Sequence, residues 1–313
     1  MFFLYIGLGL IGAFLLFFLF PTMLISNRIY SVLLIRQNKN KWSRQVSWDN
    51  EEQKQMFAIG ASFHEENKDK NITLRIKNEG FNLIAEYYDF GFNKCVIIIP
   101  GRMESGSYSL YFARPFVESG YNVLAIDNRS HGESDGRYNC LGLKEYSDII
   151  AWSELLHNEY NIETIIIHGI CIGSATALYT LISNRCPSYI KGMIADGMYA
   201  NFGESLKNHL IERNKPVFPF NNEIMWMVSV VAGKNAIKYG PLGVIDQLNK
   251  PILFLYSKED NYSTDEQANA LYEKTNCEKR IVWFDKGVHS HIRINNTLKY
   301  DNTIKEFLNE FIK

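Results

Sequence analysis

The feature that most constrains the fold is an apolar run followed by a cysteine that lies between two glycines. Residues 165–168 read Ile-Ile-Ile-His, and Gly169, Cys171 and Gly173 follow before small residues begin at Ser174. The apolar run predicts a buried strand, and the small residues after it predict a closely packed helix. A strand, a G-x-nucleophile-x-G turn and a helix form a nucleophile elbow, whose sharp turn requires small residues on both sides of the nucleophile. The helix N-terminus would favour an anion at Cys171.

From residue 95 onward the chain alternates short apolar runs with amphipathic stretches. The runs are rich in Ile, Val and Leu and nearly free of charge, as expected of strands buried on both faces of a sheet. Two stretches, 141–159 and 265–274, have the amphipathic spacing of helices. Strands that alternate with helices indicate an α/β fold with a mostly parallel, doubly wound sheet. We expect its strands at 95–100, 122–127, 164–168, 190–196, 251–256 and 280–284.

Two further segments depart from this alternation. Apolar residues that alternate with polar ones at 72–76, a turn at 78–80 and a returning run at 83–88 predict an antiparallel hairpin. Segment 199–247 is longer than one crossover requires and carries aromatic and methionine residues in helix-like pieces. We expect this segment to form a helical cap over the carboxyl edge of the sheet, where ligands bind in folds of this class.

Two stretches of the sequence resemble motifs of the α/β-hydrolase superfamily. Residues 97–102 look like its oxyanion-side loop, and residues 120–136 are similar to the D-x-R-G-H-G-x-S-x-G signature. That signature belongs to the monoglyceride lipase, lysophospholipase and serine-aminopeptidase-like branch. The resemblance covers roughly residues 70–313 and implies an α/β-hydrolase fold. Two positions depart from the pattern, because Pro100 stands where a histidine is usual and Cys171 stands where a serine is usual.

The resemblance also implies the partners of the nucleophile, which follow it along the chain in the order acid, then histidine. Asp260 lies in a stretch that resembles the acid turn of the family, and His289 lies in one similar to its G-x-x-H loop. Alternatives lie close to both positions. The alternative acids are Glu259 and Asp265, and the alternative histidine is His291.

A cysteine nucleophile, which the chain shares with dienelactone hydrolases, would work through the steps of an acyl transfer. His289 would take the thiol proton, the Cys171 thiolate would attack an acyl carbon, and Asp260 would hold the imidazole tautomer. Backbone N–H groups of Ile172 and Arg102 would form the oxyanion hole. The Arg102 side chain would either contact an anionic substrate or form a surface salt bridge. No phosphate-binding glycine loop and no metal-ligand cluster occurs in the sequence, so neither a cofactor nor a metal is expected.

The first 25 residues contain no charged side chain and consist mainly of Phe, Leu, Ile and Gly. A helix of that length spans about 37 Å, enough to cross a hydrocarbon core with some tilt. A buried core helix would more often show a polar face. A cleavable signal peptide would have a basic region before the apolar stretch and a small-residue cleavage site after it, and neither is present. We therefore predict one transmembrane helix over residues 1–27.

The flank behind this helix is basic up to the first acidic residue, Asp49. The positive-inside rule then places the flank and the following domain in the cytoplasm, with the N-terminus outside. Apolar residues at 29–35 would let the flank either lie along an anionic membrane surface or continue the membrane helix. We expect a basic juxtamembrane segment and a polar connector with one helical turn over 28–69, and an α/β-hydrolase domain over 70–313. The basic residues are Arg28, Arg36, Lys39, Lys41 and Arg44.

Charge and cysteine content argue against several other classes of protein. A net charge of −1 gives no electrostatic reason for a nucleic-acid partner. The five cysteines are widely spaced and form no CxxC pair, which argues against a disulfide framework and a zinc site.

The expected function is therefore a membrane-anchored acyl hydrolase for a carboxylester or a thioester. Analogy with the branch points to a monoacylglycerol-like or lysophospholipid-like substrate. The alternative is a catalytically silent hydrolase fold that serves as a membrane-held binding or scaffold protein, which the departures at Pro100 and Cys171 favour. The sequence leaves the oligomeric state open.

Overall fold

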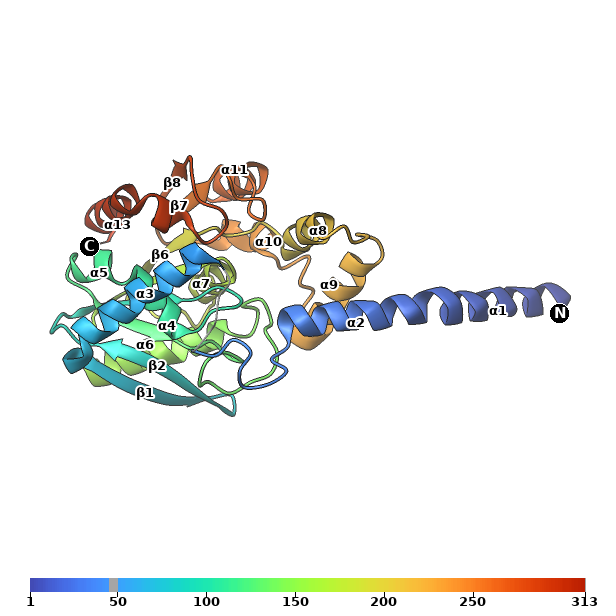
Figure 1. Ribbon diagram of the computed structural model, residues 1–313, viewed down its shortest axis with the longest axis horizontal. Helices are drawn as coiled ribbons and strands as arrows, with labels where there is room; N and C mark the ends of the chain where they lie inside the picture. Colours follow the sequence, from blue (N-terminus) through green and yellow to red (C-terminus); the bar gives the residue numbers. More distant parts are fainter. Residues whose placement is uncertain (45–49, 313) are drawn as a thin grey trace.

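The computed structural model describes residues 1–44 and 50–312 of the chain. Within these residues, eight strands form one sheet in the order β1-β2-β4-β3-β5-β6-β7-β8 (Figure 1). β1 and β2 form an antiparallel hairpin, β2 runs antiparallel to β4, and all other neighbours are parallel. The expected mostly parallel sheet is thus confirmed. The strands are β1 (Asn71–Asn78), β2 (Phe81–Tyr88), β3 (Lys94–Ile99), β4 (Asn122–Ile126), β5 (Thr164–Ile170), β6 (Ile190–Asp196), β7 (Ile252–Ser257) and β8 (Lys279–Phe284).

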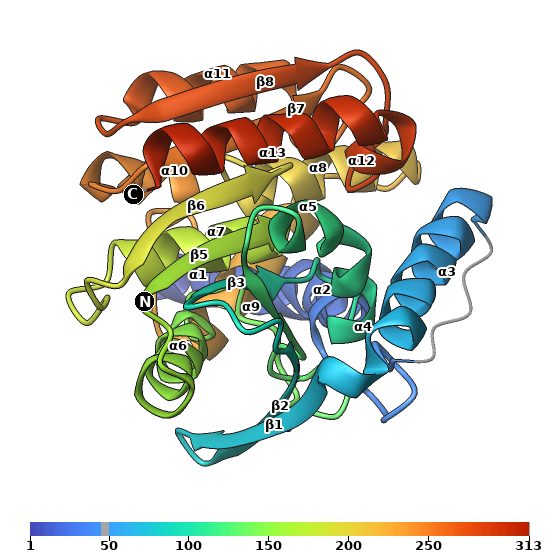
Figure 2. The same ribbon diagram turned by 90° about the vertical axis from the view of Figure 1, so that its left-hand side faces the viewer.

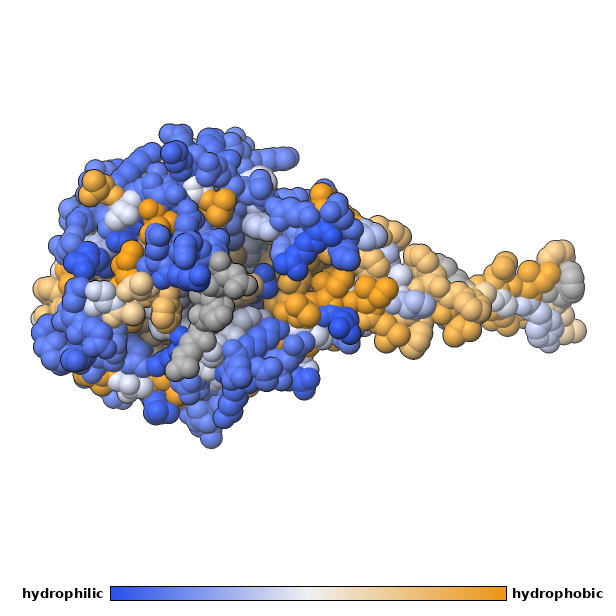
Figure 3. All heavy atoms as spheres, viewed as in Figure 1, coloured by the Kyte–Doolittle hydropathy of each residue, from blue (hydrophilic) through white to orange (hydrophobic). Residues whose placement is uncertain are grey.

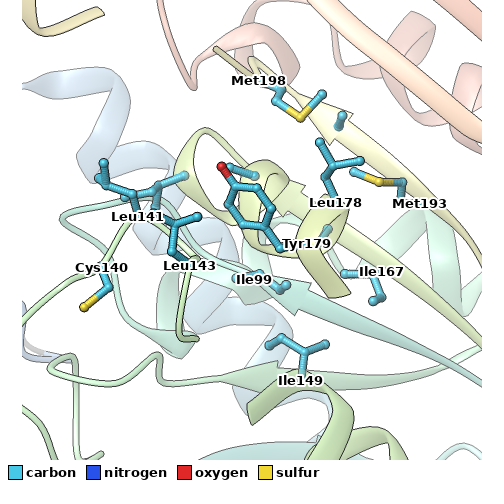
Figure 4. Close-up of a cluster of buried hydrophobic side chains, with 14 of the residues drawn as sticks. Ile99, Cys140, Leu141, Leu143, Ile149, Ile167, Leu178, Tyr179, Met193 and Met198 are labelled. Carbon is cyan, nitrogen blue, oxygen red and sulfur yellow. The ribbon is translucent and has the colours of Figure 1, made fainter. Parts of the chain in front are cut away.

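Helices cover both faces of this sheet because successive side chains of a strand point to opposite faces. In β5, Ile165 and Ile167 pack in the core layer that contains α6 (Tyr146–Tyr160) and α7 (Ile172–Leu181). Figure 4 shows part of this layer, where Ile167 lies near Leu178 of α7. Ile166 of β5 packs in the opposite layer.

The opposite layer contains α13 (Thr297–Phe311), which Figure 2 shows in front of the strands with α7 behind them. The remaining short helices connect the main elements. They are η2 (Lys68–Lys70), α4 (Gly106–Ser109), η3 (Leu110–Phe112), α5 (Arg114–Val117), α11 (Asp265–Lys274) and α12 (Ile292–Asn295).

Segment 199–247, between β6 and β7, holds two helices that lie away from the sheet on the side of the N-terminal helix (Figure 1). These are α8 (Phe202–Glu212) and α9 (Phe220–Ala232), followed by the short α10 (Pro241–Val244) and η4 (Ile245–Gln247). One face of α8 is apolar, and its Phe202 and Leu206 join the core layer of α7. We call α8 and α9 the cap helices.

The connector before the sheet differs from the expectation of one helical turn. The structure has a helix of 16 residues here, α3 (Glu51–Glu66), and residues 45–49 of the expected connector lie outside the described residues. Asn50 caps α3 by accepting a hydrogen bond from the N–H of Gln53. Met56 and Phe63 are buried on one face of α3. The connector forms a helix because Met56, Gly60 and Phe63 recur at the spacing of one helix face, a pattern that the surrounding charges obscure.

The N-terminal segment is one long helical run that leaves the domain (Figure 1). It consists of α1 (Phe2–Phe14), a π-helical turn η1 (Leu15–Leu19) and α2 (Phe20–Leu34). Within the described part of the chain, Leu16–Leu34 is a helix long and apolar enough to cross a membrane, and 17% of its most apolar window is buried. The helix continues past residue 27, so residues 29–34 prolong it rather than forming a separate interfacial helix.

The basic segment after the N-terminal helix is packed into the domain, whereas the sequence led us to expect that it lies along a membrane surface or continues the membrane helix. The carbonyl of Leu34 accepts a hydrogen bond from the N–H of Asn139 at 2.9 Å, and Ile35 pairs with Tyr138 as an antiparallel bridge. Arg44 forms ion pairs with Glu86 and Asp127 at 2.6 and 2.8 Å. Arg44, and Arg36 through its hydrogen bond to the Ser134 carbonyl at 2.9 Å, therefore serve contacts within the fold, which a pattern of charges along the sequence cannot reveal.

Candidate active site

Cys171 lies at the expected sharp turn between β5 and α7. Its backbone adopts φ 55° and ψ −110°, a left-handed conformation that costs a non-glycine residue about 1–3 kcal/mol and is typical of functional sites. The turn leaves no room for side chains beside it. A Cβ atom at Gly169 would lie 2.4 Å from the carbonyl carbon of Gly173, and one at Gly173 would lie 2.2 Å from the carbonyl oxygen of Ile99. The two glycines are therefore sterically required, as the sequence pattern predicts.

Asp260 and His289 come from the loops that follow β7 and β8, and they form a hydrogen-bonded pair. The Nδ1 atom of His289 lies 2.7 Å from Oδ2 of Asp260. The other carboxylate oxygen of Asp260 accepts hydrogen bonds from the N–H groups of Tyr262 and Ser263 at 2.8 and 2.9 Å. Burial acts to raise the pKa of Asp260, but His289 and these donors lower it below its usual value. Asp260 is therefore ionised and orients the imidazole ring.

The imidazole ring of His289 also interacts with Cys171. Burial disfavours a charge on the ring, but the charges of Asp260 and Cys171 and hydrogen bonds to both raise the pKa of His289 well above its usual value. Both side chains line the same cavity. His289 is therefore placed to accept the thiol proton of Cys171, the step that produces the reactive form of a cysteine nucleophile.

The structure decides between the alternative residues that the sequence leaves open. Glu259 accepts a hydrogen bond from the N–H of Gly287, and Asp265 forms an ion pair with Lys258. His291 is bonded to Glu52 through Nδ1 at 2.7 Å. These side chains are held by partners away from the cavity, so Asp260 and His289 are the pair that meets Cys171.

The candidate oxyanion donors lie on two elements beside Cys171. Ile172 is the first residue of α7, so its N–H lacks an intrahelical acceptor. Arg102 lies in the loop after β3. Glu104 holds this loop by accepting a hydrogen bond from the N–H of Gly101 at 2.9 Å.

The N-terminal segment holds the same loop from outside. The Arg102 guanidinium donates a hydrogen bond to the carbonyl of Leu33 at 3.1 Å, and among the described residues no carboxylate pairs with it. The Nε2 atom of His131 lies 2.7 Å from the Arg102 carbonyl oxygen, and its Nδ1 atom lies 2.9 Å from the Arg129 carbonyl oxygen. The ring of His131 stacks on buried Trp42, with ring centroids 4.5 Å apart. The expected surface salt bridge of Arg102 is therefore replaced by a contact with the N-terminal helix.

The cavity in front of Cys171 has a volume of about 270 Å³. Its walls come from the oxyanion loop, the cap helix α8, the loops that carry Asp260 and His289, and the end of α2. Apolar side chains predominate on the side of the cap and of α2. The apolar wall residues are Leu33 of α2, Met103 of the oxyanion loop, and Phe202 and Leu206 of α8.

Sequence reasoning missed several residues of this site. Glu104 is buried on the cavity wall, and burial raises its pKa to about 7 despite the hydrogen bond from Gly101. Tyr199 and His209 line the cavity from the cap segment. None of these side chains belongs to a motif with fixed spacing, so only the distance to Cys171 in the folded chain identifies them. Among the described residues, no group of three or more His, Cys, Asp or Glu is placed to hold a metal ion.

Comparisons with known proteins agree with this architecture. Residues 94–216 match the family model described as the alpha/beta hydrolase fold. The uncharacterized protein YqkD of Bacillus subtilis (strain 168) is 33% identical over 215 residues, which cover 68% of this chain and 70% of that protein. This chain belongs to the α/β-hydrolase fold family.

Solved structures show the same fold at lower identity. The Pyrococcus furiosus esterase Pf2001 is 20% identical, with a TM-score of 0.66 over 88% of this chain and 100% of that chain. The Pyrococcus horikoshii acylaminoacyl peptidase is 19% identical, with a TM-score of 0.57 over 78% of this chain and 42% of that chain. These likenesses concern the fold, since both identities are low.

Proposed function

We propose that the protein is a membrane-anchored acyl hydrolase that cleaves a carboxylester or a thioester through a Cys171–His289–Asp260 triad. The observation that carries this proposal is the hydrogen bond of 2.7 Å between Asp260 and His289, at the wall of the cavity that Cys171 enters from a strained turn. A chain that had lost its chemistry would have no need to keep this pair and this turn together.

The reaction follows from the position of each group. The Cys171 thiolate attacks the acyl carbonyl carbon, and the N–H groups of Ile172 and Arg102 stabilise the oxyanion. His289, which holds the thiol proton, donates it to the departing oxygen or sulfur as the bond to the leaving group breaks. His289 then takes a proton from water, whose oxygen attacks the acyl-thioester carbon. The acid product leaves, and the sulfur of Cys171 is free again.

The cavity supports a lipid-like ester as the substrate, such as a monoacylglycerol or a lysophospholipid. An acyl chain would lie against Leu33, Phe202 and Leu206, which are apolar and buried. Leu33 belongs to the helix that we propose as the membrane anchor, so the cavity lies next to the point where that helix enters the domain. This arrangement favours a substrate that the membrane itself supplies.

The contact between α2 and α9 holds an exposed apolar face of the cap next to the helix that we propose as the membrane anchor. Thr22 and Ser26 of α2 donate hydrogen bonds to the two oxygens of the buried Glu223 carboxylate in α9, at 2.7 and 2.6 Å. Trp226 and Val230, one helical turn apart on α9, are 57% and 60% exposed. Figure 3 shows that the hydrophobic surface of the N-terminal helix continues onto the domain where the two meet. The cap would therefore touch the bilayer surface, with the domain on the cytoplasmic side as the basic flank predicts.

A binding or scaffold protein without catalysis is the second candidate function. The specific observation in its favour is the double departure from the family pattern, with Pro100 beside the oxyanion loop and Cys171 as the nucleophile. The intact contact of His289 with Asp260 counts against it.

Ester hydrolysis by the full chain in detergent micelles tests the proposal. The full chain is required because residues 28–44 pack into the domain and Leu33 lines the cavity. Wild type is compared with C171S, C171A and H289A on p-nitrophenyl esters of increasing chain length. Turnover by wild type and its loss in both alanine variants would support the triad. A silent wild type together with activity in C171S would support the binding protein instead.

A further inference from the structure

A second cavity, with a volume of about 570 Å³, lies beside the end of α2. Among the residues that the structure describes, it shares none of its walls with the cavity of Cys171. One wall comes from segment 136–146, which is joined to the end of α2 by the bridge between Ile35 and Tyr138. Another wall is the end of the cap helix α9, residues 231–234. The cavity therefore forms where the N-terminal helix and the cap meet the domain (Figure 1).

Three cations on the walls of this cavity, Arg137, Lys144 and Lys234, form no ion pair within the described part of the chain. All three are exposed, so a ligand from outside can reach them. The Arg137 guanidinium lies 5.7 Å from the centre of the Tyr138 ring, and the Lys234 ammonium lies 5.5 Å from the centre of the Tyr146 ring. Both rings line the same cavity, so these cation–π contacts hold the two charges at its walls.

The acidic groups near this cavity already have partners. Arg129, the fourth cation of the walls, forms ion pairs with Glu79 at 2.8 Å and with Asp148. The Glu145 carboxylate is buried and accepts hydrogen bonds from two backbone N–H groups of its own loop, at 2.7 and 3.0 Å. The four cations outnumber these three carboxylates. An excess of positive charge is therefore left at the cavity for an anion from outside.

The position along α2 places these cations close to the surface of the proposed membrane. Arg28 is the first charged side chain of the sequence, and the Leu34 carbonyl, which is bonded to segment 136–146 through Asn139, lies six residues further on. Six residues of an α-helix rise about 9 Å. The headgroup layer of a bilayer extends about 5–8 Å beyond the hydrocarbon core on each side. Long basic side chains extend toward such a surface, so the cations of the cavity can reach the level of the lipid phosphates.

We propose that this cavity binds the phosphate group of an anionic phospholipid through Arg137, Lys144 and Lys234. The inference rests on the membrane anchor of the proposed function and adds a lipid site apart from the active site. The arginine fork matches two phosphate oxygens, and the two lysines add charge. Basic pockets beside membrane helices on the cytoplasmic side recognise lipid headgroups in this way. Leu143 and Val231 supply apolar wall for the part of the lipid next to its phosphate.

Lipid binding by the full chain tests the site. Delipidated protein in dodecyl maltoside micelles receives equal mole fractions of phosphatidylglycerol and phosphatidylcholine, and native mass spectrometry measures the bound lipid. Phosphatidylglycerol is the anionic probe, whereas phosphatidylcholine carries a phosphate without net charge. We expect wild type to prefer phosphatidylglycerol about fivefold or more, because one basic residue near an anionic surface already has an effect of that size.

Variants identify the cations. R137Q, K144Q and K234Q should each lower the preference for phosphatidylglycerol, and the triple variant should abolish it. The matched controls R75Q and K191Q remove the same charges from β1 and β6, outside this cavity, and should leave the preference unchanged. Equal amounts of both lipids on wild type, or an unchanged preference in the triple variant, would overturn the proposal.

Inorganic phosphate and glycerol 1-phosphate distinguish a lipid from a soluble ligand. Both carry the same charged group without acyl chains, and neither should displace phosphatidylglycerol when added in large molar excess. Displacement by either compound would assign the cavity to a soluble phosphate and reject the phospholipid.

The lipid site and the proposed function fail in different ways. If wild type hydrolyses no ester but prefers phosphatidylglycerol, the acyl hydrolase is wrong and the lipid site stands. If the full chain hydrolyses esters and floats with vesicles but binds both lipids equally, the anchored hydrolase stands and the lipid site is wrong.

Discussion

The guanidinium of Arg102 donates a hydrogen bond to the backbone carbonyl of Leu33 at 3.1 Å, which ties the end of the apolar N-terminal helix to the loop beside Cys171. If the N-terminal helix were joined to the domain by a flexible linker, its position would not affect the geometry of the site. Here the helix that leaves the domain also lines the cavity and holds a loop that carries one of the proposed oxyanion donors. The position of the N-terminal helix and the geometry of the site are therefore coupled.

Trp42 should position the oxyanion loop through His131. W42A removes the ring on which His131 stacks, so the imidazole that contacts the Arg102 carbonyl is no longer held in place. We expect kcat to fall about tenfold or more with little change in KM, since an oxyanion contact acts mainly in the transition state. W42F keeps an aromatic ring and should retain most of the activity. Equal loss in both variants, or a change in KM alone, would contradict this role.

Removal of residues 1–44 should unfold the domain, whereas removal of residues 1–14 should not. The longer deletion takes away buried Leu33, Leu34 and Trp42 and the ion pairs of Arg44, a loss of about 6 kcal/mol or more. The shorter deletion leaves α2 and all of these contacts in place. Urea denaturation in detergent micelles measures both. If the longer deletion variant unfolds cooperatively at the same urea concentration as wild type, the structural role of α2 is refuted.

Cys171 should react with iodoacetamide faster than a free thiol in solution. His289 lies against it in a position to take its proton, whereas burial raises the pKa of Cys95 and that of Cys140. H289A should slow the labelling of Cys171 about tenfold or more, because the thiolate is then no longer stabilised. Mass spectrometry of labelled peptides gives the rate at each cysteine. Labelling of Cys171 no faster than a free thiol would favour the silent binding protein.

The stabilising effect of His289 should depend on pH. Its pKa is raised in the folded chain, so the folded state binds its proton more tightly than the unfolded state does. The resulting stabilisation is fully present below the usual histidine pKa of about 6.5 and is lost as pH rises through the folded-state pKa. The difference in unfolding free energy between wild type and H289Q should therefore be larger at pH 5.5 than at pH 9. A difference that is the same at both pH values would show that Asp260 and Cys171 do not hold the proton.

Trp226 should contact the acyl chains of a bilayer. Vesicles of phosphatidylcholine and phosphatidylglycerol with brominated acyl chains should quench part of the tryptophan fluorescence of the wild-type protein. This quenched part should be missing in W226F. W283F is the matched control, because Trp283 lies on β8 and its loss should leave that part in place. Unchanged quenching in W226F would show that Trp226 of the cap does not contact the bilayer. Failure of the full chain to float with the vesicles would contradict the anchor itself.

Short-range patterns in the sequence predict the parallel strands and the position of the elbow. Short runs of Ile, Val and Leu with little charge correspond to strands β3 to β7, because burial on both faces of a parallel sheet selects such residues locally. The edge strand β8 is only half-buried and begins with Lys279 and Arg280. The elbow was readable because Gly169 and Gly173 are required by contacts within a few residues of Cys171 and with the adjacent strand. Both features depend on short-range patterns.

Which residues meet at the site depends on contacts between segments that are distant in the chain. Glu259 and Asp260 are both carboxylic acids, and His289 and His291 carry the same side chain, so the sequence alone does not identify the acid and the base. The identification depends on which side chain the loop directs toward Cys171. The burial of one face of helix α3 and the contact of Leu33 with Arg102 likewise arise from partners far away in the chain. Local periodicity records whether a residue is buried, but it does not record against which residue, and chemistry at this site depends on the second property.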